Sequence, residues 1–566
     1  MNALTIPEWT TACPNWEALL VSKQSIIPVG ALYPDAANQA MDVMENLVMS
    51  DLANKPRFGQ VARQWAMDFP RAIFGAYDPE SGARRIREFF MLISKKNSKS
   101  TLSAGIMLTA LVLNWREGAK FMIIAPTKKV ASNSFDQAVG MIRNDPHLAA
   151  ILHIQGYGRL IRHRLTNATL EILAADSETV TGTIATGVLI EEVHEFGKKE
   201  RAEAMFLEAK GGIASRPEGF VIYLTTHSEE PPAGVFKKLL QYARDVRDGK
   251  IIDPQFLPVL YEFPNWMLEA DLHKKPENFY ITNPNLGASV SENYLVSEFK
   301  KAEESGEESL RGFMAKHLNV PLGLNLRSDR WRGADYWENQ ATVLSLDDLL
   351  ERSEVVIVGG DGGGLDDLLG MAVLGRDKVS KDWLLWAHAW CSRKVLEVRK
   401  NIASRLLDFE AAGELTIVDE DSGDQDCYEF GAICGRIYEM GLLHQVGLDP
   451  LMIGGLMDGI IDGGVPAELI FEVKQGFRLD GYIKTSERKL SAKKLWHGNS
   501  GLMNWCVGNA RIEQKGNNIY ITKQASGRAK IDPVIAMLNA VGLMSLNPEA
   551  MGGEYSDYSD MVMVGI

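Results

Sequence analysis

Short apolar runs of strand length, each followed by a helical stretch, constrain this chain more than any other feature of its sequence. Between residues 85 and 230 the runs are Phe89–Ser94, Lys120–Thr127, Thr169–Ala175, Gly187–Ile190 and Phe220–Thr226. Strands that are apolar along their whole length are buried on both faces, and the helices between them return the chain to the same edge. The pattern predicts an α/β domain built on a parallel sheet.

A second group of strands follows a connector over residues 321–353. The runs are Val355–Gly360, Gly370–Gly375, Trp383–Trp390, Leu442–Leu448 and Ala467–Val473, then a hairpin over Arg511–Gln524 with Gly516 and Asn517 at its turn. An apolar helix begins near Asp532. The intervening residues 255–320 are interrupted by proline and have no strong strand, which favours a small helical subdomain. We therefore predict four parts: a helical segment over 1–60, a first α/β domain over 61–254, a helical lid or linker over 255–330 and a second domain over 331–566.

Composition excludes several classes of protein. Of the 566 residues, 46% are apolar, which is enough for large cores, and the net charge is −14. Such an acidic chain does not coat nucleic acid, so a DNA partner would need positive charge gathered in a channel. The five cysteines form no CxxC pair, which argues against a zinc ribbon and for a reducing compartment. The N-terminus lacks the pattern of a signal peptide and no apolar run spans a bilayer, so we expect a soluble intracellular protein.

A polar loop between the first strand and its helix is the first candidate site. The segment FFMLISKKNSKSTLSAGIMLTALVL changes from strand to polar loop to helix, which is the context that a phosphate-binding loop requires. Lys99 is the candidate phosphate lysine and Ser100 the candidate magnesium ligand. The whole loop offered to the nucleotide is Lys95, Lys96, Asn97, Ser98, Lys99, Ser100 and Thr101. The alternative is an ordinary basic turn before a helix.

Polar residues at the ends of two later strands fit the same site. GVLIEEVHEF is an apolar strand that ends in Glu191 and Glu192. In an ATPase the first acid holds magnesium and the second polarises the attacking water. FVIYLTTHSEE ends in Thr225 and Thr226, whose hydroxyls are placed to sense the γ-phosphate. The alternative is a solvated acidic loop beside a strand in which threonine is common. His194 has no evident partner in the sequence, and we expect a structural or surface histidine.

Three aspartates in the second half form the other candidate site. Asp361 ends the strand of VVIVGGDGGG, Asp449 ends the strand of HQVGLDP, and Asp532 begins the helix of KIDPVIAMLNA. Carboxylates at element ends can converge on one or two Mg²⁺ or Mn²⁺ ions that break a phosphodiester. Each has a simpler explanation as a turn residue or helix cap. Asp366 and Asp367 are further candidate ligands, and His497 is either an accessory group or a surface histidine.

These pieces occur in the order found in tailed-phage terminase large subunits, which the chain resembles from about Arg84 to Leu546. RRIREFFMLISKKNSKST resembles that family's P-loop, VLIEEVHEF its Walker B motif with the catalytic glutamate, and TTHS its coupling motif. WHGNSGLMNWCVGNA followed by KIDPVIAMLNAVG is the most distinctive match. The resemblance implies a P-loop ATPase domain over 61–254 and a ribonuclease H-like nuclease over 331–566. Glu192 would be the catalytic carboxylate and Glu191 the magnesium-side acid, with Asp361, Asp449 and Asp532 as the nuclease triad.

The resemblance also implies what the protein works with. We expect ATP with Mg²⁺ at the first site and Mn²⁺ or Mg²⁺ at the second. The expected partners are double-stranded DNA, a small terminase subunit and a procapsid portal protein, with the chain acting as a homo-oligomeric ring in the host cytoplasm and without a membrane. Two residues depart from the family pattern: Ser98 replaces a glycine and Glu191 replaces an aspartate. Arg84, Arg85 and Arg216 are candidates for nucleotide contacts, with surface positions as the alternative.

Two rival functions remain at this point. A helicase–nuclease would share both sites but would separate strands. A non-enzymatic scaffold descended from the same family would keep the fold without hydrolysing ATP, and the departures at Ser98 and Glu191 are what suggest it.

Overall fold

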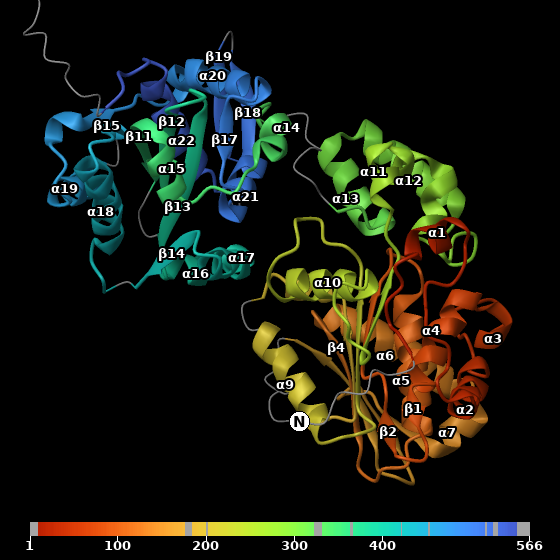
Figure 1. The fold of residues 1–566 in the computed structure, drawn as a ribbon. Helices are drawn as coiled ribbons and strands as arrows, with labels where there is room; N and C mark the ends of the chain where they lie inside the picture. Colours follow the sequence, from red (N-terminus) through yellow and green to blue (C-terminus); the bar gives the residue numbers. More distant parts are fainter. Residues whose placement is uncertain are drawn as a thin grey trace, which may run out of the picture. The chain divides into compact units, whose positions relative to one another are not determined.

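The computed structural model divides the chain into two compact units, Met1–Gly323 and Leu324–Ile566. It describes residues 9–175, 184–199, 202–321, 331–362, 366–419, 421–450, 453–515, 518–523 and 530–551. The turn expected at Gly516 and Asn517 and the tail after residue 551 lie outside these ranges. Figure 1 shows the first unit in red to green and the second in green to blue.

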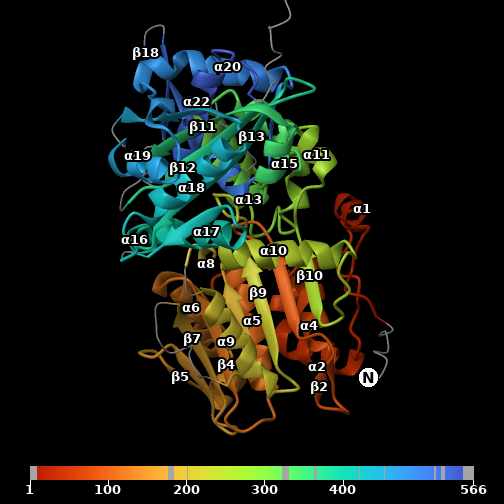
Figure 2. The same ribbon diagram turned by 60° about the vertical axis from the view of Figure 1, so that its left-hand side comes forward.

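The first unit is built on an eight-stranded sheet (Figure 2). Its order is β10 (Phe256–Leu260), β3 (Glu88–Leu92), β9 (Phe220–Thr225), β8 (Gly187–Glu191), β4 (Lys120–Ala125), β7 (Thr169–Ala174), β6 (Leu160–His163) and β5 (Leu152–Gln155). The strands from β10 to β7 run parallel, and β6 and β5 close one edge as an antiparallel hairpin. The carboxyl ends of β3, β9 and β8 therefore lie next to one another.

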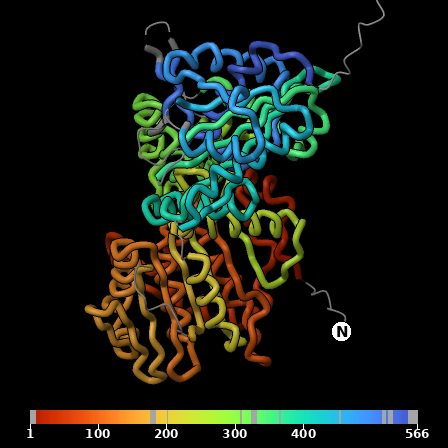
Figure 3. The backbone as a smooth tube through the Cα atoms, turned by 90° about the vertical axis from the view of Figure 1, so that its left-hand side faces the viewer, coloured from red at the N-terminus to blue at the C-terminus, as the bar shows by residue number. Residues whose placement is uncertain are grey.

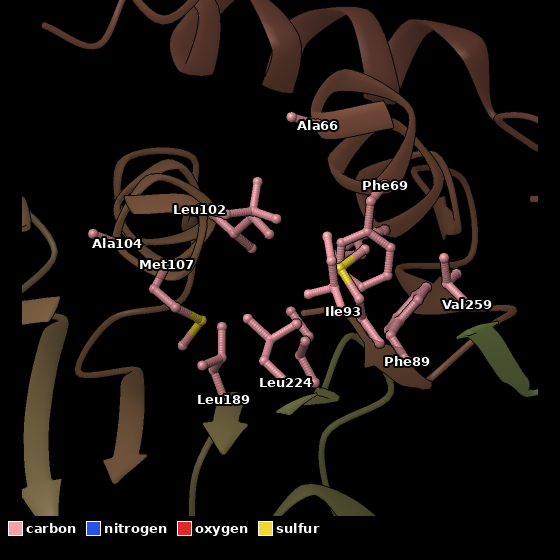
Figure 4. Packing of buried hydrophobic residues seen from close by; sticks show 14 of the residues in the cluster. Ala66, Phe69, Phe89, Ile93, Leu102, Ala104, Met107, Leu189, Leu224 and Val259 are labelled. Atoms are coloured by element: carbon pink, nitrogen blue, oxygen red, sulfur yellow. The ribbon is translucent and has the colours of Figure 1, made fainter. Parts of the chain in front are cut away.

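Helices cover both faces of this sheet, and each face has its own core. One face packs against α2 (Pro34–Glu45), α4 (Gln64–Phe74), α5 (Lys99–Val112) and α6 (Lys128–Arg143), and the other against α8 (Val193–Phe196), α9 (Ala202–Ala214) and α10 (Gly234–Arg247). In Figure 4, Met107 of α5 reaches toward Leu189 and Leu224, while Phe69 of α4 lies over Phe89. The two rings meet edge to face at 6.4 Å. This packing holds the strands that carry the candidate nucleotide site.

A helical layer completes the first unit. It consists of α11 (Asn265–Glu269), two 3₁₀ turns at Leu272–Lys274 and Pro276–Ile281, α12 (Glu292–Glu304) and α13 (Glu307–Leu318). The N-terminal segment with α1 (Trp16–Val21) lies against it, since Tyr280 donates its hydroxyl to the carbonyl of Val21. Figure 3 shows this red segment next to the yellow-green chain. The first unit also contains the short elements α3 (Phe58–Val61), α7 (Pro146–Ile151), β1 (Tyr77–Asp78) and β2 (Ala83–Arg84).

The second unit contains a seven-stranded mixed sheet. Its order is β14 (Leu415–Val418), β13 (Trp383–Ser392), β12 (Leu369–Asp377), β11 (Ser353–Gly362), β15 (Leu443–Leu448) and β16 (Ile470–Glu472), with β17 (Leu495–His497) also paired to β13. The strands β11, β12 and β13 form an antiparallel meander, and the other strands add in parallel. A separate hairpin joins β18 (Ala510–Lys515) and β19 (Asn518–Lys523).

Helices again cover both faces. One face packs against α15 (Leu346–Arg352), α18 (Gln425–Glu439) and α19 (Ile453–Asp462), and the other against α17 (Lys400–Ala411), α20 (Asp480–Ser491), α21 (Gly501–Asn509) and α22 (Asp532–Met544). The short helices α14 (Ala334–Trp337) and α16 (Lys394–Val398) contribute buried residues to the same core as α17. No helix in the described part of the chain combines the length and the apolar character needed to cross a bilayer.

Glycines let backbones touch directly at two places in the second unit. A methyl group placed on Gly359 of β11 would come within 1.9 Å of the Ala536 carbonyl of α22. One placed on Gly431 of α18 would come within 1.8 Å of the Gly459 carbonyl of α19. Real Cβ atoms do not approach that closely. Glycine at these two positions therefore allows α22 to contact β11, and α18 to contact α19, through their backbones.

The predicted α/β architecture is confirmed, and the ten predicted runs and the hairpin all contain strands, with ends shifted by a few residues. One expectation was wrong: residues 255–320 do contain a strand, because Phe256–Leu260 forms β10 at the edge of the sheet. Pro258 in that segment argued against a strand, but proline is tolerated on edge strands, where one side makes no hydrogen bonds. The sequence reading also missed the hairpin of β5 and β6 and the short strands β14 and β17.

Candidate functional sites

The polar loop joins β3 to α5 at the carboxyl edge of the first sheet. Two of its residues, Lys96 and Ser98, have positive φ angles of 73° and 59°. This left-handed conformation is the one that glycine adopts without strain. Ser98 is the residue before α5, and its side chain makes no capping hydrogen bond there. The loop thus holds two residues with side chains in the conformation that glycine favours.

Lys99 lies inside the loop and faces the Walker B-like strand. Its Nζ is 3.9 Å from Glu192 Oε1 and 3.5 Å from the carbonyl oxygens of Ile93 and Ser94. The side chain is 9% exposed. Burial lowers the pKa of Lys99, and the carboxylates of Glu192 and Glu191 oppose that shift. A phosphate group entering the loop would bring negative charge next to Lys99 and stabilise its charged form.

Glu191 is buried at the end of β8. The hydroxyl of Ser134 on α6 donates to its carboxyl oxygens at 2.8 and 2.7 Å. Burial raises the pKa of Glu191 to about 7, and hydrogen bonds from Ser103 and Ser134 work against the rise. Because burial disfavours the charged form of Glu191, a bound cation would stabilise that form.

Glu192, the next residue, has a positive φ of 51° and turns the chain away from the sheet. Its Oε2 is 3.4 Å from Nδ1 of His194. The same Nδ1 is 3.2 Å from Oγ1 of Thr225 and 3.4 Å from Oγ1 of Thr226. Backbone strain of this kind is concentrated at functional sites, and here it brings the candidate catalytic acid beside the candidate coupling threonines.

The helical layer holds the loop from outside through asparagine side chains. Asn97 donates to Oδ1 of Asn283 at 2.9 Å and accepts from the backbone N–H of Asn285 at 3.0 Å. Ser289 donates to the carbonyl of Lys96 at 2.7 Å, and Asn285 reaches Oγ of Ser98 at 3.4 Å. These hydrogen bonds from the helical layer hold the loop in a conformation that glycine would adopt without support.

The remaining loop residues also lie at the carboxyl edge of the first sheet. The backbone N–H of Lys95 donates to the Lys316 carbonyl at 2.8 Å. Ser100 is half-buried in the first turn of α5, and Thr101 beside it donates to Gln137 at 3.4 Å. All the residues proposed for the nucleotide therefore lie at one edge of the first sheet. Arg84 does not: it bonds the carbonyls of Glu218, at 2.8 Å, and Ile73 at the amino edge of the sheet.

The three aspartates of the second unit lie at one end of its sheet. Gly360 and Leu448 are register partners of the parallel strands β11 and β15, so Asp361 and Asp449 follow at neighbouring strand ends. Asp532 begins α22, and a methyl group on Gly362 would come within 2.9 Å of its Oδ1. Asn539 of α22 donates to the Gly360 carbonyl at 2.9 Å, which holds the helix to this strand.

The donor set at this end suits a hard divalent cation, since all three residues offer carboxylate oxygens. Among the described residues, no three His, Cys, Asp or Glu side chains are already gathered as a metal cage. The backbone therefore brings the three acids to one edge without closing a site.

Neighbouring groups that were candidate ligands are engaged elsewhere. Arg399 bonds both carboxyl oxygens of Asp366 at 2.8 and 2.6 Å. The buried ammonium of Lys530 bonds Asp367 Oδ1 at 2.6 Å. His497 is neither a surface residue nor part of the acidic edge: it is 2% exposed and stacked on Trp337 at 3.9 Å.

Sequence reasoning gave no role at the first site to four residues that lie there: His194, Asn283, Asn285 and Ser134. The signal for His194 was its position two residues after the candidate catalytic glutamate. For the asparagines there was no local signal, because Asn97 and Asn283 are 186 positions apart.

Two family models match consecutive parts of this chain. Residues 68–245 match the family described as terminase large subunit, ATPase domain, and residues 261–547 match terminase large subunit, endonuclease domain. The large terminase subunit of Enterobacteria phage HK97 is 23% identical over 492 residues, covering 86% of this chain and 92% of that protein. The terminase large subunit of Lactococcus phage p2 is 22% identical over 480 residues, covering 81% and 82%. The crystal structure of the HK97 large terminase covers 90% of this chain and 99% of its own, with a TM-score of 0.48 and 20% identity.

Proposed function

The chain belongs to the terminase large-subunit family, and from that premise we propose how its residues divide the work. As a member it is an ATPase and an endonuclease that acts in packaging DNA and cutting concatemers. Family membership favours an enzyme over the non-enzymatic scaffold, and a packaging enzyme over the helicase–nuclease. We assign ATP hydrolysis to residues 61–254, a lid or linker role to 255–330 and cutting to 331–566, with 1–60 as an N-terminal helical segment. The lid then also contributes β10 to the ATPase sheet.

The proposed ATPase site uses the loop Lys95–Thr101 for the phosphates. Lys99 neutralises the β- and γ-phosphates, and Ser100 and Glu191 hold the Mg²⁺ that accompanies ATP. Glu192 takes a proton from water as the water oxygen bonds to the γ-phosphorus. The bond to the β–γ bridging oxygen breaks, and ADP and phosphate leave. Thr225 and Thr226 sense the loss of the γ-phosphate.

One observation carries this proposal: Lys99 Nζ lies 3.9 Å from Glu192 Oε1, although the two residues belong to separate strand–helix units. A lysine and a glutamate that meet at the carboxyl edge of a parallel sheet mark where such sheets bind ligands. ATP would separate the pair by placing its phosphates on the lysine and the attacking water on the glutamate.

The ATPase test uses the full chain and three variants. Lys99→Ala and Glu192→Gln should each lower ATP turnover by about 100-fold or more, because each removes a charge aimed at the reacting phosphate. Lys120→Ala is the matched control, since Lys120 is exposed at the opposite end of β4. Turnover by Lys99→Ala equal to that of the wild type would refute the assignment.

For the nuclease, we propose that Asp361, Asp449 and Asp532 hold Mg²⁺ or Mn²⁺. The bound cation supplies an activated water and stabilises the leaving oxygen of a phosphodiester. The residues themselves provide oxygen donors from two strand ends and one helix start. The backbone contacts of α22 with Gly362 and Gly360 support their common position.

Plasmid cutting in Mn²⁺ tests the nuclease assignment. Asp361→Ala should abolish cutting and leave ATP turnover unchanged. Asp458→Ala, an exposed aspartate on α19, should cut like the wild type. Persistence of cutting in Asp361→Ala would show that the cation is held elsewhere.

We further propose that the chain works as a ring on double-stranded DNA, with a small terminase subunit and a portal protein, in the host cytoplasm. Family membership supports these partners. A strand-displacement assay separates packaging from unwinding, because the motor should hydrolyse ATP on intact duplex and release little single strand.

A further inference from the structure

Asn319 directly follows α13, and its side chain is fully buried. Its exposed fraction is 0%, and its φ of 48° is left-handed. Asparagine adopts this conformation more readily than most residues, and it is found at helix ends for that reason. The end of α13 is closed by a backbone hydrogen bond, because the N–H of Val320 donates to the Met314 carbonyl at 3.1 Å. The Asn319 amide is therefore held inside the first unit at a defined helix end.

The amide of Asn319 bonds the ends of two strands. Its Oδ1 accepts from the backbone N–H of His227 at 3.1 Å, and its Nδ2 donates to the Tyr261 carbonyl at 2.9 Å. A backbone N–H can only donate and a carbonyl can only accept, so the orientation of the amide is unambiguous. His227 comes directly after the Thr225–Thr226 pair at the end of β9, and Tyr261 comes directly after β10.

These two strands lie on either side of β3, the strand that leads into the phosphate loop. Where β3 ends, the carbonyl of Leu92 accepts from the N–H of Tyr261 at 2.9 Å, and the N–H of Ile93 donates to the Thr225 carbonyl at 3.0 Å. Asn319 joins the neighbours of β3 to each other just beyond this point. It therefore helps to set where Thr225 and the residue after it lie relative to the loop.

The same turn of α13 also binds the phosphate loop. The carbonyl of Lys316 accepts from the N–H of Lys95 at 2.8 Å, and the carbonyl of His317 accepts from Nδ2 of Asn283 at 2.8 Å. Asn283 in turn accepts from Asn97 of the loop. The last carbonyls of a helix have no partner within the helix. Here two of them are used by the loop and by the residue that supports it.

We propose that Asn319 is a positioning residue for ATP hydrolysis, which holds the Thr225–Thr226 pair in register with the phosphate loop. The inference rests on the proposed ATPase site. The end of α13 then makes two sets of contacts, one from Asn319 to the threonine strand and one from the carbonyls of Lys316 and His317 to the loop. Loss of the first set disturbs the geometry of reaction, and loss of the second weakens the binding of phosphates.

Substitutions in the full chain separate the two sets of contacts. Asn319→Gly removes both amide hydrogen bonds and keeps the left-handed backbone without strain. Asn319→Asp keeps an oxygen that accepts from the N–H of His227. Asn283→Ala removes the support of the loop instead. Asn54→Gly is the matched control, because Asn54 is an exposed residue of the first unit with a φ of 62°. Glu192→Gln is the reference for the proposed site.

The measurements are kcat for ATP and, by calorimetry, the affinity for ADP with Mg²⁺. We expect Asn319→Gly to lower kcat by about 10- to 100-fold with ADP affinity within about twofold of the wild type, because a misplaced group costs rate more than binding. Asn319→Asp should lie between the glycine variant and the wild type. Asn283→Ala should weaken ADP binding by about fivefold or more, with kcat at saturating ATP within about threefold of the wild type. Asn54→Gly should match the wild type in both.

Wild-type kcat in Asn319→Gly would overturn the proposal. Equal losses of kcat and of ADP affinity in both the Asn319 and the Asn283 variants would do so too, because a turn that only packs would affect the two quantities alike. Thermal unfolding is followed for each variant. If the glycine variant does not fold, Asn319→Asp decides by the same criterion, a lowered kcat with unchanged affinity.

The reference variant separates this inference from the function on which it rests. If Glu192→Gln retains turnover, the proposed function fails rather than the role of Asn319. If Glu192→Gln is inactive while Asn319→Gly hydrolyses ATP like the wild type, only the role of Asn319 fails.

Discussion

Ser98 shows at the scale of one residue how the phosphate loop departs from its family pattern. Its φ of 59° is unfavourable for any residue with a Cβ. The Asn285 contact at 3.4 Å is the one hydrogen bond that its hydroxyl receives among the described residues. Hydrogen bonds from the helical layer keep the loop in this strained conformation.

Ser98→Gly should therefore stabilise the protein. Relief of the left-handed strain outweighs the greater freedom of glycine in the unfolded chain, and we expect the free energy of unfolding to rise by about 0.5–1 kcal/mol. Urea unfolding measures it. Ser100→Gly, which alters a residue within α5, should have the opposite sign, and a fall in stability for both would contradict the strain argument.

His497 makes a specific contribution to stability that depends on pH. Its Nε2 bonds the Trp337 carbonyl at 2.8 Å, and its Nδ1 accepts from the backbone N–H of Asn499 at 3.2 Å. The neutral ring satisfies both contacts, and the charged ring would lose the second. Burial lowers the pKa of His497 to about 4, while the hydrogen bond to Trp337 opposes the shift.

The sign of the effect follows from this depressed pKa. Between about pH 6.5 and pH 4 the unfolded chain binds a proton at His497 that the folded chain does not, so stability falls as the pH falls through that window. The contribution reaches about 3 kcal/mol. Urea unfolding at pH 7.5, 6 and 5 should show a shallower loss for His497→Gln than for the wild type. Identical slopes would show that the ring titrates normally.

At the scale of elements, the contact between α18 and α19 depends on glycines, which have no side chain to separate the two backbones. A methyl group on Gly431 would lie 1.8 Å from the Gly459 carbonyl, and one on Gly435 would lie 1.9 Å from that of Gly463. Two helices in backbone contact cannot accept a methyl group without moving apart.

Gly431→Ala should therefore lower the free energy of unfolding by about 1–3 kcal/mol, the range for forced overpacking. Gly454→Ala is the matched control on α19, because nothing lies within 4 Å of the added methyl group. That variant should lose no stability, because the added methyl group meets no neighbour. Thermal unfolding distinguishes the two, and equal effects would refute close packing as the cause.

The elements that could be predicted from sequence are those with local signals. Strands β3, β4, β7, β8 and β9 are largely apolar runs, and the helix at Asp532 begins with an acid followed by proline. Strand β17 could not be found this way, because it spans only Leu495–His497 and exists through its pairing with β13. The same limit holds for the nucleotide site. Lys99 and Glu192 follow strand ends, whereas Asn283 and Asn285 reach the loop only through the tertiary fold.

At the scale of the whole molecule, the division after Gly323 predicts separate responses to ligands. A non-hydrolysable ATP analogue should stabilise the first unit alone, by about 2.7 kcal/mol at 100 times its Kd. In calorimetry one unfolding transition should move to higher temperature and the other should stay. Lys99→Ala should abolish the shift. A single transition that moves as a whole would show that the two units unfold together.

The bare backbone of β11 and β12 under α22 limits how this protein can diverge. Added methyl groups at Gly359, Gly362 and Gly370 would strike α22 or, at Gly362, also the neighbouring Leu368 carbonyl. Natural variation should therefore be nearly absent at these three positions, even where the outer side of the helix has changed freely. Conservation of the cutting site would then require these three glycines as well as the three aspartates.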